Sequence, residues 1–175
     1  MRESAAWRSQ AVADDDMGTR VEHVDDGRTY AHAAAKYQQS VEKAVKAVVV
    51  ILRHAGIMAI NQPRQHRIDM LVTAILAVPR AGVPRDPLER AHRLFSAAVR
   101  RDIRALDDVA PAWPAAGALH AKNTEYPYQV TAVNWLPPAD ASTFTRGDMK
   151  RFRYTSRRVS KELDRIVDAL ELLFP

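Results

Sequence analysis

The longest helical pattern in the sequence, between Arg28 and His54, constrains the fold more than any other feature. Apolar and small residues recur in it at spacings of three and four, which places them along one side of an α-helix. This seam consists of Ala34, Gln38, Val41, Val45, Val48 and Leu52. Gly56 supplies a residue type that commonly follows the end of a helix. Because a long helix with one apolar side needs other helices to cover it, the sequence predicts a helical bundle.

Three further segments show the same helical spacing. They cover about 66–78, 86–108 and 147–174, and Pro87 occupies a position at which proline starts a helix well. The residues before 24 are only weakly amphipathic, because Gly18 and an acidic run interrupt their pattern. No segment alternates polar and apolar residues over a useful length, as a half-buried strand would. We therefore expect an all-α fold, an antiparallel bundle of four to five helices.

A length of 175 residues fits one domain, so we assign residues 1–175 to a single helical unit. Residues at about 111–146 stand apart, because they are rich in proline and in aromatic side chains. An irregular segment of this length in a compact domain is usually functional or packed by its own side chains. We expect it to interrupt the bundle, with a short helix at about 115–122.

The composition excludes several classes of protein. The chain has no cysteine, which excludes disulfides, thiolate zinc sites and a cysteine nucleophile. Its histidines lack the spacing of zinc ligands, and no glycine-rich phosphate loop is present, so we expect no metal and no cofactor. The longest apolar run, Ala47–Leu52, is too short to cross a membrane. The start of the chain has no apolar core of a signal peptide, so a cytoplasmic protein is expected.

Charge is distributed unevenly along the chain. Residues 1–26 hold three of the 26 bases but seven of the 21 acids, so the rest of the chain is more basic than the net charge of +5 indicates. A basic protein body favours polyanions such as RNA or nucleotides. A solvated basic surface without a ligand has the same composition, and both interpretations stay open.

The predicted last helix carries a basic stripe at helical spacing. The stripe consists of Lys150, Arg153, Arg157, Lys161 and Arg165. Such a stripe can follow the phosphates of RNA, while Tyr126 and Tyr128 from the preceding segment are candidates for stacking on bases. The alternative is a solvated helix face, whose charge Glu162 and Asp164 reduce.

The stretch Tyr30–Ala47 carries a recognisable motif. Its elements are Gln38-Gln39, Glu42-Lys43 and Lys46-Ala47, followed by the apolar run 48–52. This stretch resembles the signature of the HEPN family (higher eukaryotes and prokaryotes nucleotide-binding). Further along, Pro63–His66 is similar to the Pro-x-x-His that opens the family's next helix, and Glu125-Tyr126-Pro127 to its Tyr-Pro element. The resemblance extends from about residue 7 to residue 173.

The HEPN resemblance implies a helical bundle that binds RNA or a nucleotide and forms a homodimer. It also implies a nucleotidyltransferase-type partner protein in a toxin–antitoxin, stress or defence system. Gln38 lies on the apolar seam and Glu42 borders it, and buried polar groups need partners. These residues either form a structural network or line a polar cleft for a ligand. The candidate cleft residues are Gln38, Glu42, Lys46, Arg64 and His66.

Many HEPN proteins are metal-independent ribonucleases with an Arg-x(4–6)-His motif, in which arginine holds the phosphate and histidine transfers protons. The match here is Arg85-x6-His92, the candidate catalytic pair. The pattern places Arg85 in a proline-flanked loop and His92 on an apolar helix side, where a histidine is more often part of the core. Glu125 also replaces the arginine that many relatives have before Tyr-Pro.

Three hypotheses follow. The first is an RNA- or nucleotide-binding domain that acts with a partner protein. The second is an active ribonuclease that uses Arg85 and His92. The third is a non-catalytic structural interaction bundle. Whether the chain is an enzyme therefore stays open.

Overall fold

The computed structural model describes residues 2–24, 27–59, 67–79, 85–109, 128–129, 135–136 and 144–174. Its helices are α1 (Glu3–Glu22), α2 (Gly27–His54), α3 (Ile68–Leu76), α4 (Arg85–Leu94), α5 (Ala97–Asp107) and α7 (Arg146–Leu173). Two short strands, β1 (Tyr128–Gln129) and β2 (Trp135–Leu136), pair antiparallel. Apart from this strand pair the described chain is helical, and the predicted helical bundle is confirmed.

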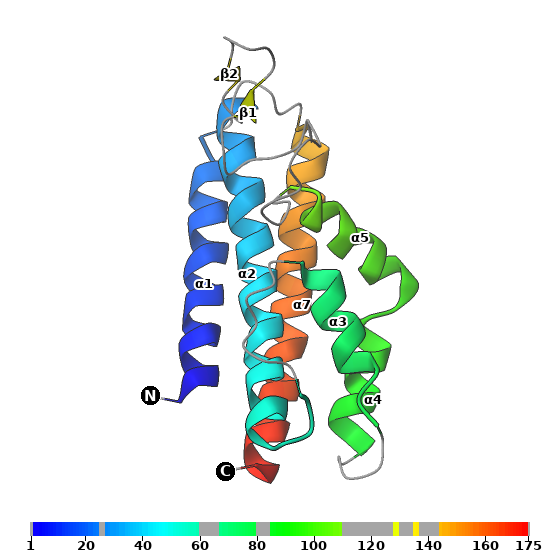
Figure 1. Cartoon of the computed structure of the whole chain (residues 1–175). Helices are drawn as coiled ribbons and strands as arrows, with labels where there is room; N and C mark the ends of the chain where they lie inside the picture. Colours follow the sequence, from blue (N-terminus) through cyan, green and yellow to red (C-terminus); the bar gives the residue numbers. More distant parts are fainter. Residues whose placement is uncertain are drawn as a thin grey trace.

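The three long helices α1, α2 and α7 lie side by side, and the short helices α3, α4 and α5 lie on the side away from α1 (Figure 1). Contacts between Ser4 and Glu171 and between Glu22 and Arg153 show that α1 runs antiparallel to α7. An ion pair between Glu3 and Arg53 shows the same for α2. The antiparallel arrangement is thus found for α1, whereas α2 and α7 run parallel to each other. A parallel pair requires the chain between them to return across the molecule.

The core lies where α2 and α7 face each other and the short helices. The predicted seam of α2 is buried, with every member at most 1% exposed. The facing residues of α7 are Phe152, Val159, Leu163, Ile166 and Leu170, and none is more than 4% exposed. Both long helices end within about two residues of their predicted limits, because spacings of three and four define them clearly.

The predicted helix at 86–108 is two helices. Phe95 and Ser96 separate α4 from α5, and Ser96 has the extended backbone of a helix N-cap. Phe95 is buried in the core, so the break redirects the chain without exposing its apolar side. The predicted short helix at 115–122 and most of the segment 111–146 lie outside the described residues.

The first helix is more regular than its sequence indicates. The side of α1 that faces the bundle holds Ser4, Ala11, Asp14, Gly18 and Glu22, which are spaced as a helical seam although most are polar. A Cβ added at Gly18 would lie 2.9 Å from a ring carbon of Tyr37, so glycine allows α1 and α2 to approach closely here. Among the described helices, none combines the length and apolar character needed to cross a membrane.

Candidate nucleic-acid interface

The predicted polar residues Gln38, Glu42 and Lys46 form a buried network, and each is at most 4% exposed. Lys46 Nζ donates to Glu42 Oε1 at 2.5 Å, and Gln38 Nε2 donates to Glu42 Oε2 at 3.3 Å. The Lys46 ammonium also lies 5.1 Å from the ring centroid of Trp7 on α1, in a cation–π contact. Since α1 covers these groups, they form a structural network and not an open cleft. The other predicted cleft residues, Arg64 and His66, lie outside the described residues.

Three of the five residues of the predicted basic stripe are paired within the protein: Arg165 with Glu162 of the same helix, and Arg153 and Arg157 with carboxylates of α1. Arg153 Nη1 lies 3.3 Å from Glu22 Oε1, and Arg157 Nε lies 3.3 Å from Asp15 Oδ2. Arg157 also donates to Thr19 Oγ1 at 3.2 Å. The acidic first helix is therefore docked on the basic last helix, which sequence spacing alone does not reveal.

The Glu22 carboxylate has a second partner on α2. The Tyr37 hydroxyl donates to Glu22 Oε2 at 2.6 Å, and both side chains are buried. Burial and this hydrogen bond raise the pKa of Tyr37, so it stays a neutral donor at physiological pH. Glu22 thereby joins the three long helices at one point.

The remaining two residues of the stripe are open to solvent. Lys150 and Lys161 are exposed and make no ion pair with any described residue. Tyr154 lies between them in the sequence and is 66% exposed. Such exposure is unusual for an aromatic residue on a charged helix. Its neighbours at three and four residues in both directions are Lys150, Arg151, Arg157 and Arg158.

Sequence reasoning did not select Tyr154, although its spacing from four bases was a usable signal. The aromatic residues that it selected cannot be compared. Tyr126 lies outside the described residues, and only the backbone of Tyr128, in β1, is described. An exposed aromatic ring between basic side chains can stack on a nucleobase of RNA, while the lysine and arginine side chains bind the neighbouring phosphates.

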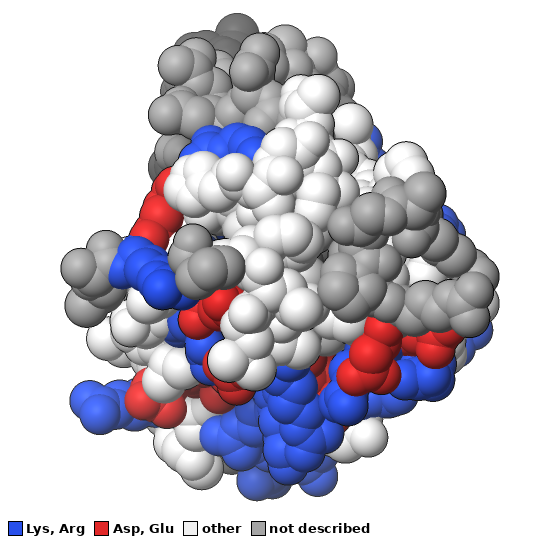
Figure 2. Space-filling model, turned by 90° about the horizontal axis from the view of Figure 1, so that it is seen from below, with Lys and Arg blue, Asp and Glu red and all other residues white. Residues whose placement is uncertain are grey.

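Next to this surface, α7 and α4 enclose a groove of about 350 Å³. Its lining residues are Arg90, Arg93, Leu94, Arg158 and Glu162. Arg90 and Arg93 have only exposed partners one turn away on α4, at 3.0 and 3.9 Å, and such pairs are weak. Arg158 has no ion pair among the described residues. Figure 2 shows Lys and Arg side chains gathered on one side of the end of the molecule seen from below.

His92 is not where the sequence pattern predicted. It is exposed, and Ala91 takes the core position between Leu88 and Phe95. Arg85, predicted in a loop, is the first residue of α4. Because seven residues are almost two helical turns, positions 85 and 92 lie on the same side of α4. Position 92 is separated by about 160° around the helix from position 90, which lines the groove.

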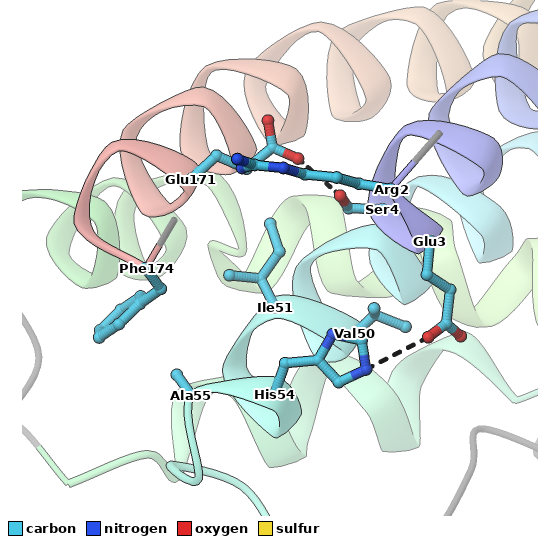
Figure 3. Close-up of a pocket in the computed structure, with 9 residues that line it drawn as sticks. All are labelled: Arg2, Glu3, Ser4, Val50, Ile51, His54, Ala55, Glu171 and Phe174. Atoms are coloured by element: carbon cyan, nitrogen blue, oxygen red, sulfur yellow. Dashed lines mark hydrogen bonds and ion pairs between the residues drawn. The ribbon is translucent and has the colours of Figure 1, made fainter.

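A second concavity, of about 530 Å³, lies where the start of α1 meets the ends of α2 and α7 (Figure 3). Its polar side chains largely bind one another. His54 Nε2 lies 3.4 Å from Glu3 Oε2, and Ser4 Oγ donates to Glu171 Oε1 at 2.5 Å. Val50, Ile51 and Phe174 supply apolar lining. These internal contacts close α1 onto the other two helices.

One buried carboxylate acts as a helix cap. Asp107 accepts hydrogen bonds from the backbone amides of Ile68 and Asp69, at 2.8 and 2.9 Å, at the start of α3. Burial raises the pKa of Asp107 to about 6, against the opposing effect of these hydrogen bonds. Asp107 therefore titrates near neutral pH for a structural reason, far along the chain from the basic residues of α7.

Comparisons with known proteins returned no match for this chain: no protein-family model fits it, and no curated protein or solved structure matches it. Within the described residues, no group of three His, Asp or Glu side chains is placed to hold a metal ion.

Proposed function

We propose that this chain is an RNA-binding helical domain. Its binding surface, the α7–α4 basic surface, consists of Lys150, Tyr154, Arg158, Lys161, Arg90 and Arg93. The observation that carries the proposal is the groove in which Arg158, which has no ion pair among the described residues, lies opposite two arginines of α4, with Glu162 as the one acid in the lining. Guanidinium groups grip phosphate through paired hydrogen bonds, and converging ones hold it more firmly than single surface charges.

Tyr154 adds a contact that a purely electrostatic surface lacks. Its exposed ring lies within one helical turn of Lys150 and Arg158. A base that stacks on this ring would place its phosphates near those charges. The surface therefore favours single-stranded RNA, whose bases are free to stack, over a regular duplex.

The resemblance to HEPN proteins supports the same proposal from the sequence. It adds a nucleotidyltransferase-type partner, a homodimer and a role in a toxin–antitoxin, stress or defence system. The α7–α4 basic surface needs none of these additions in order to bind RNA, so they can be tested separately.

The test is binding of a fluorescently labelled single-stranded RNA, measured by anisotropy at several salt concentrations. Replacing Arg90 and Arg158 together with alanine should weaken binding about tenfold and lower the salt slope by roughly two, because two phosphate contacts are lost. Tyr154→Ala should weaken binding by about fivefold or more at every salt concentration.

Arg20→Ala is the matched control, because Arg20 is exposed on α1 and also has no ion pair among the described residues. It should change RNA affinity by less than about twofold. Equal losses in Arg20→Ala and in the Arg90/Arg158 variant would contradict a localised surface. A wild-type protein that binds no RNA even at low salt would favour the structural interaction bundle.

The exposure of His92 on the side of α4 that also holds position 85 favours a second candidate function, the metal-independent ribonuclease. An exposed imidazole can transfer protons near neutral pH. Purified protein should then degrade RNA in the presence of a chelator, and His92→Ala should abolish this without changing the melting temperature. Degradation that persists in His92→Ala contradicts this candidate.

A further inference from the structure

We infer that a second groove for single-stranded RNA lies between α2 and α7, and that α1 occupies it with its own carboxylates. This inference rests on the proposed RNA binding. We call this site the α1-covered groove, and its basic residues are Lys36 and Lys43 of α2 and Arg153 and Arg157 of α7. The consequence is an RNA affinity that α1 limits.

Each base of the α1-covered groove has a carboxylate of α1 as its partner. Asp14 binds both lysines, with Lys36 Nζ 3.2 Å from Asp14 Oδ1. Glu22 and Asp15 bind Arg153 and Arg157. The carboxylates of α1 therefore occupy the positions that we infer for the phosphates of a bound RNA strand. An RNA strand that replaced them would contact four basic side chains on two helices.

The attachment of α1 makes such a replacement feasible. Ala11 is the one apolar residue on α1 that is fully buried, while Trp7 and Val21 are partly buried. The remaining buried residues of α1 are polar or glycine, so release of α1 exposes little apolar surface of its own. Release of a helix at low free energy, without global unfolding, is common in proteins. Competing ions also weaken partly exposed ion pairs.

Continuity with the α7–α4 basic surface favours RNA as the occupant over an acidic helix of another protein. Arg153 and Arg157 lie within one turn of Tyr154 on α7. Arg157 also directly precedes Arg158, which lines the groove to α4. A strand bound at Tyr154 therefore has phosphates next to the ion pairs that hold α1.

Arg8→Gln separates this inference from simple charge effects. Arg8 joins α1 to α7 through Asp164 at 3.0 Å and Asp168 at 2.7 Å, away from the four bases of the groove. Its loss should speed hydrogen exchange in α1 and raise RNA affinity about threefold to fivefold, although a positive charge is removed. If overall charge alone determined binding, the loss of Arg8 would lower RNA affinity.

Arg104→Gln is the matched control, because it removes the same charge from a residue of α5 that pairs with Asp69 of α3 at 3.2 Å and, among the described residues, forms no ion pair with α1. It should leave exchange in α1 unchanged and RNA affinity unchanged or slightly lower. In the Arg8→Gln/Arg157→Gln double variant, α1 should stay loosened while the gain in affinity disappears, because a base of the groove is missing.

Faster exchange in α1 without a gain in RNA affinity overturns the inference, and the proposed function survives if the Arg90/Arg158 variant still binds more weakly. Unchanged exchange in Arg8→Gln also overturns it, because α1 is then not held by these charges. A synthetic peptide of residues 3–24 that binds Arg8→Gln better than RNA does would assign the groove to an acidic helix. If the Arg90/Arg158 variant binds RNA as tightly as the wild type, the proposed function itself is contradicted.

Discussion

The two long helices that pack against α2 are held by different chemistry. The interface with α7 is aliphatic, with valines of α2 facing residues such as Leu163 and Ile166. The interface with α1 is more polar, because Asp14, near the middle of α1, binds two lysines of α2, and Glu22, at the end of α1, accepts a hydrogen bond from Tyr37. Aliphatic burial stabilises at any salt concentration, whereas the partly exposed ion pairs of α1 weaken when salt screens them. The bundle thus combines two helices joined by aliphatic packing with a third helix whose buried side is mostly polar.

The largest expected effect concerns the ion pair of Glu42 and Lys46, in which both side chains are buried, unlike the partly exposed ion pairs of α1. Glu42→Gln leaves the Lys46 ammonium buried without its counter-charge and should lower the free energy of unfolding by about 3–5 kcal/mol. Urea denaturation measures this loss. The Glu42→Leu/Lys46→Met variant should recover most of the stability, because no charge is then buried. A double variant as unstable as Glu42→Gln would contradict this explanation.

A somewhat smaller effect is expected in the aliphatic interface. Leu163→Ala removes a side chain that is 1% exposed and should destabilise the protein by about 2–4 kcal/mol, equally at low and high salt. Leu172→Ala is the control, because Leu172 is 85% exposed and its loss should be close to neutral. Denaturation curves at two salt concentrations distinguish the outcomes. A strong salt dependence of the Leu163→Ala loss would erase the contrast between the two interfaces.

Gly18→Ala tests how closely α1 approaches α2. Alanine normally stabilises a helix interior relative to glycine by about 1 kcal/mol, but here its Cβ would overlap the Tyr37 ring. We expect a net loss of about 2 kcal/mol and faster hydrogen exchange in α1. Gly147→Ala on α7 is the control, since the nearest atom lies at 3.4 Å, and it should be neutral or stabilising. Stabilisation by Gly18→Ala would mean that α1 lies farther from α2.

The last effect is a pH dependence that belongs to neither interface and is spread over about two pH units. The pKa of Asp107 is raised to about 6, so its contribution to stability is fully present below about pH 4 and is lost as the pH rises through 6. The free energy of unfolding of the wild type, relative to Asp107→Asn, should therefore fall over this range by up to about 3 kcal/mol. Parallel pH profiles of the two proteins would show that Asp107 has an ordinary pKa.

The sequence was sufficient for the aliphatic interface and insufficient for the charged one. Spacings of three and four locate the seams of α2 and α7 because nearly all of their residues are apolar; the polar exceptions are Gln38 on α2 and Ser156, which is also buried, on α7. The inward side of α1 instead contains Asp14 and Glu22, which local pattern analysis assigns to solvent. Their partners are distant in the chain, so only the tertiary structure reveals that these acids are buried.

The candidate site shows the same division. Sequence spacing groups the basic residues of α7 into a stripe, but it could not show that Arg153 and Arg157 already bind α1. His92 was assigned to the core because its spacing from Leu88 fits, although Ala91 fits equally well and is the buried residue. In both cases the decisive information is which other helix lies opposite, and a single sequence does not contain it.

The measurement that tests the central claim most directly is hydrogen exchange of the full-length protein at low salt and at about 0.5 M sodium chloride, a concentration that screens partly exposed ion pairs. We predict that amides in α1 exchange faster at high salt, whereas those at 41–52 in α2 and at 159–170 in α7 keep their rates. Exchange in α1 that is as slow as in α2 at both salt concentrations would contradict the claim that charge holds the first helix.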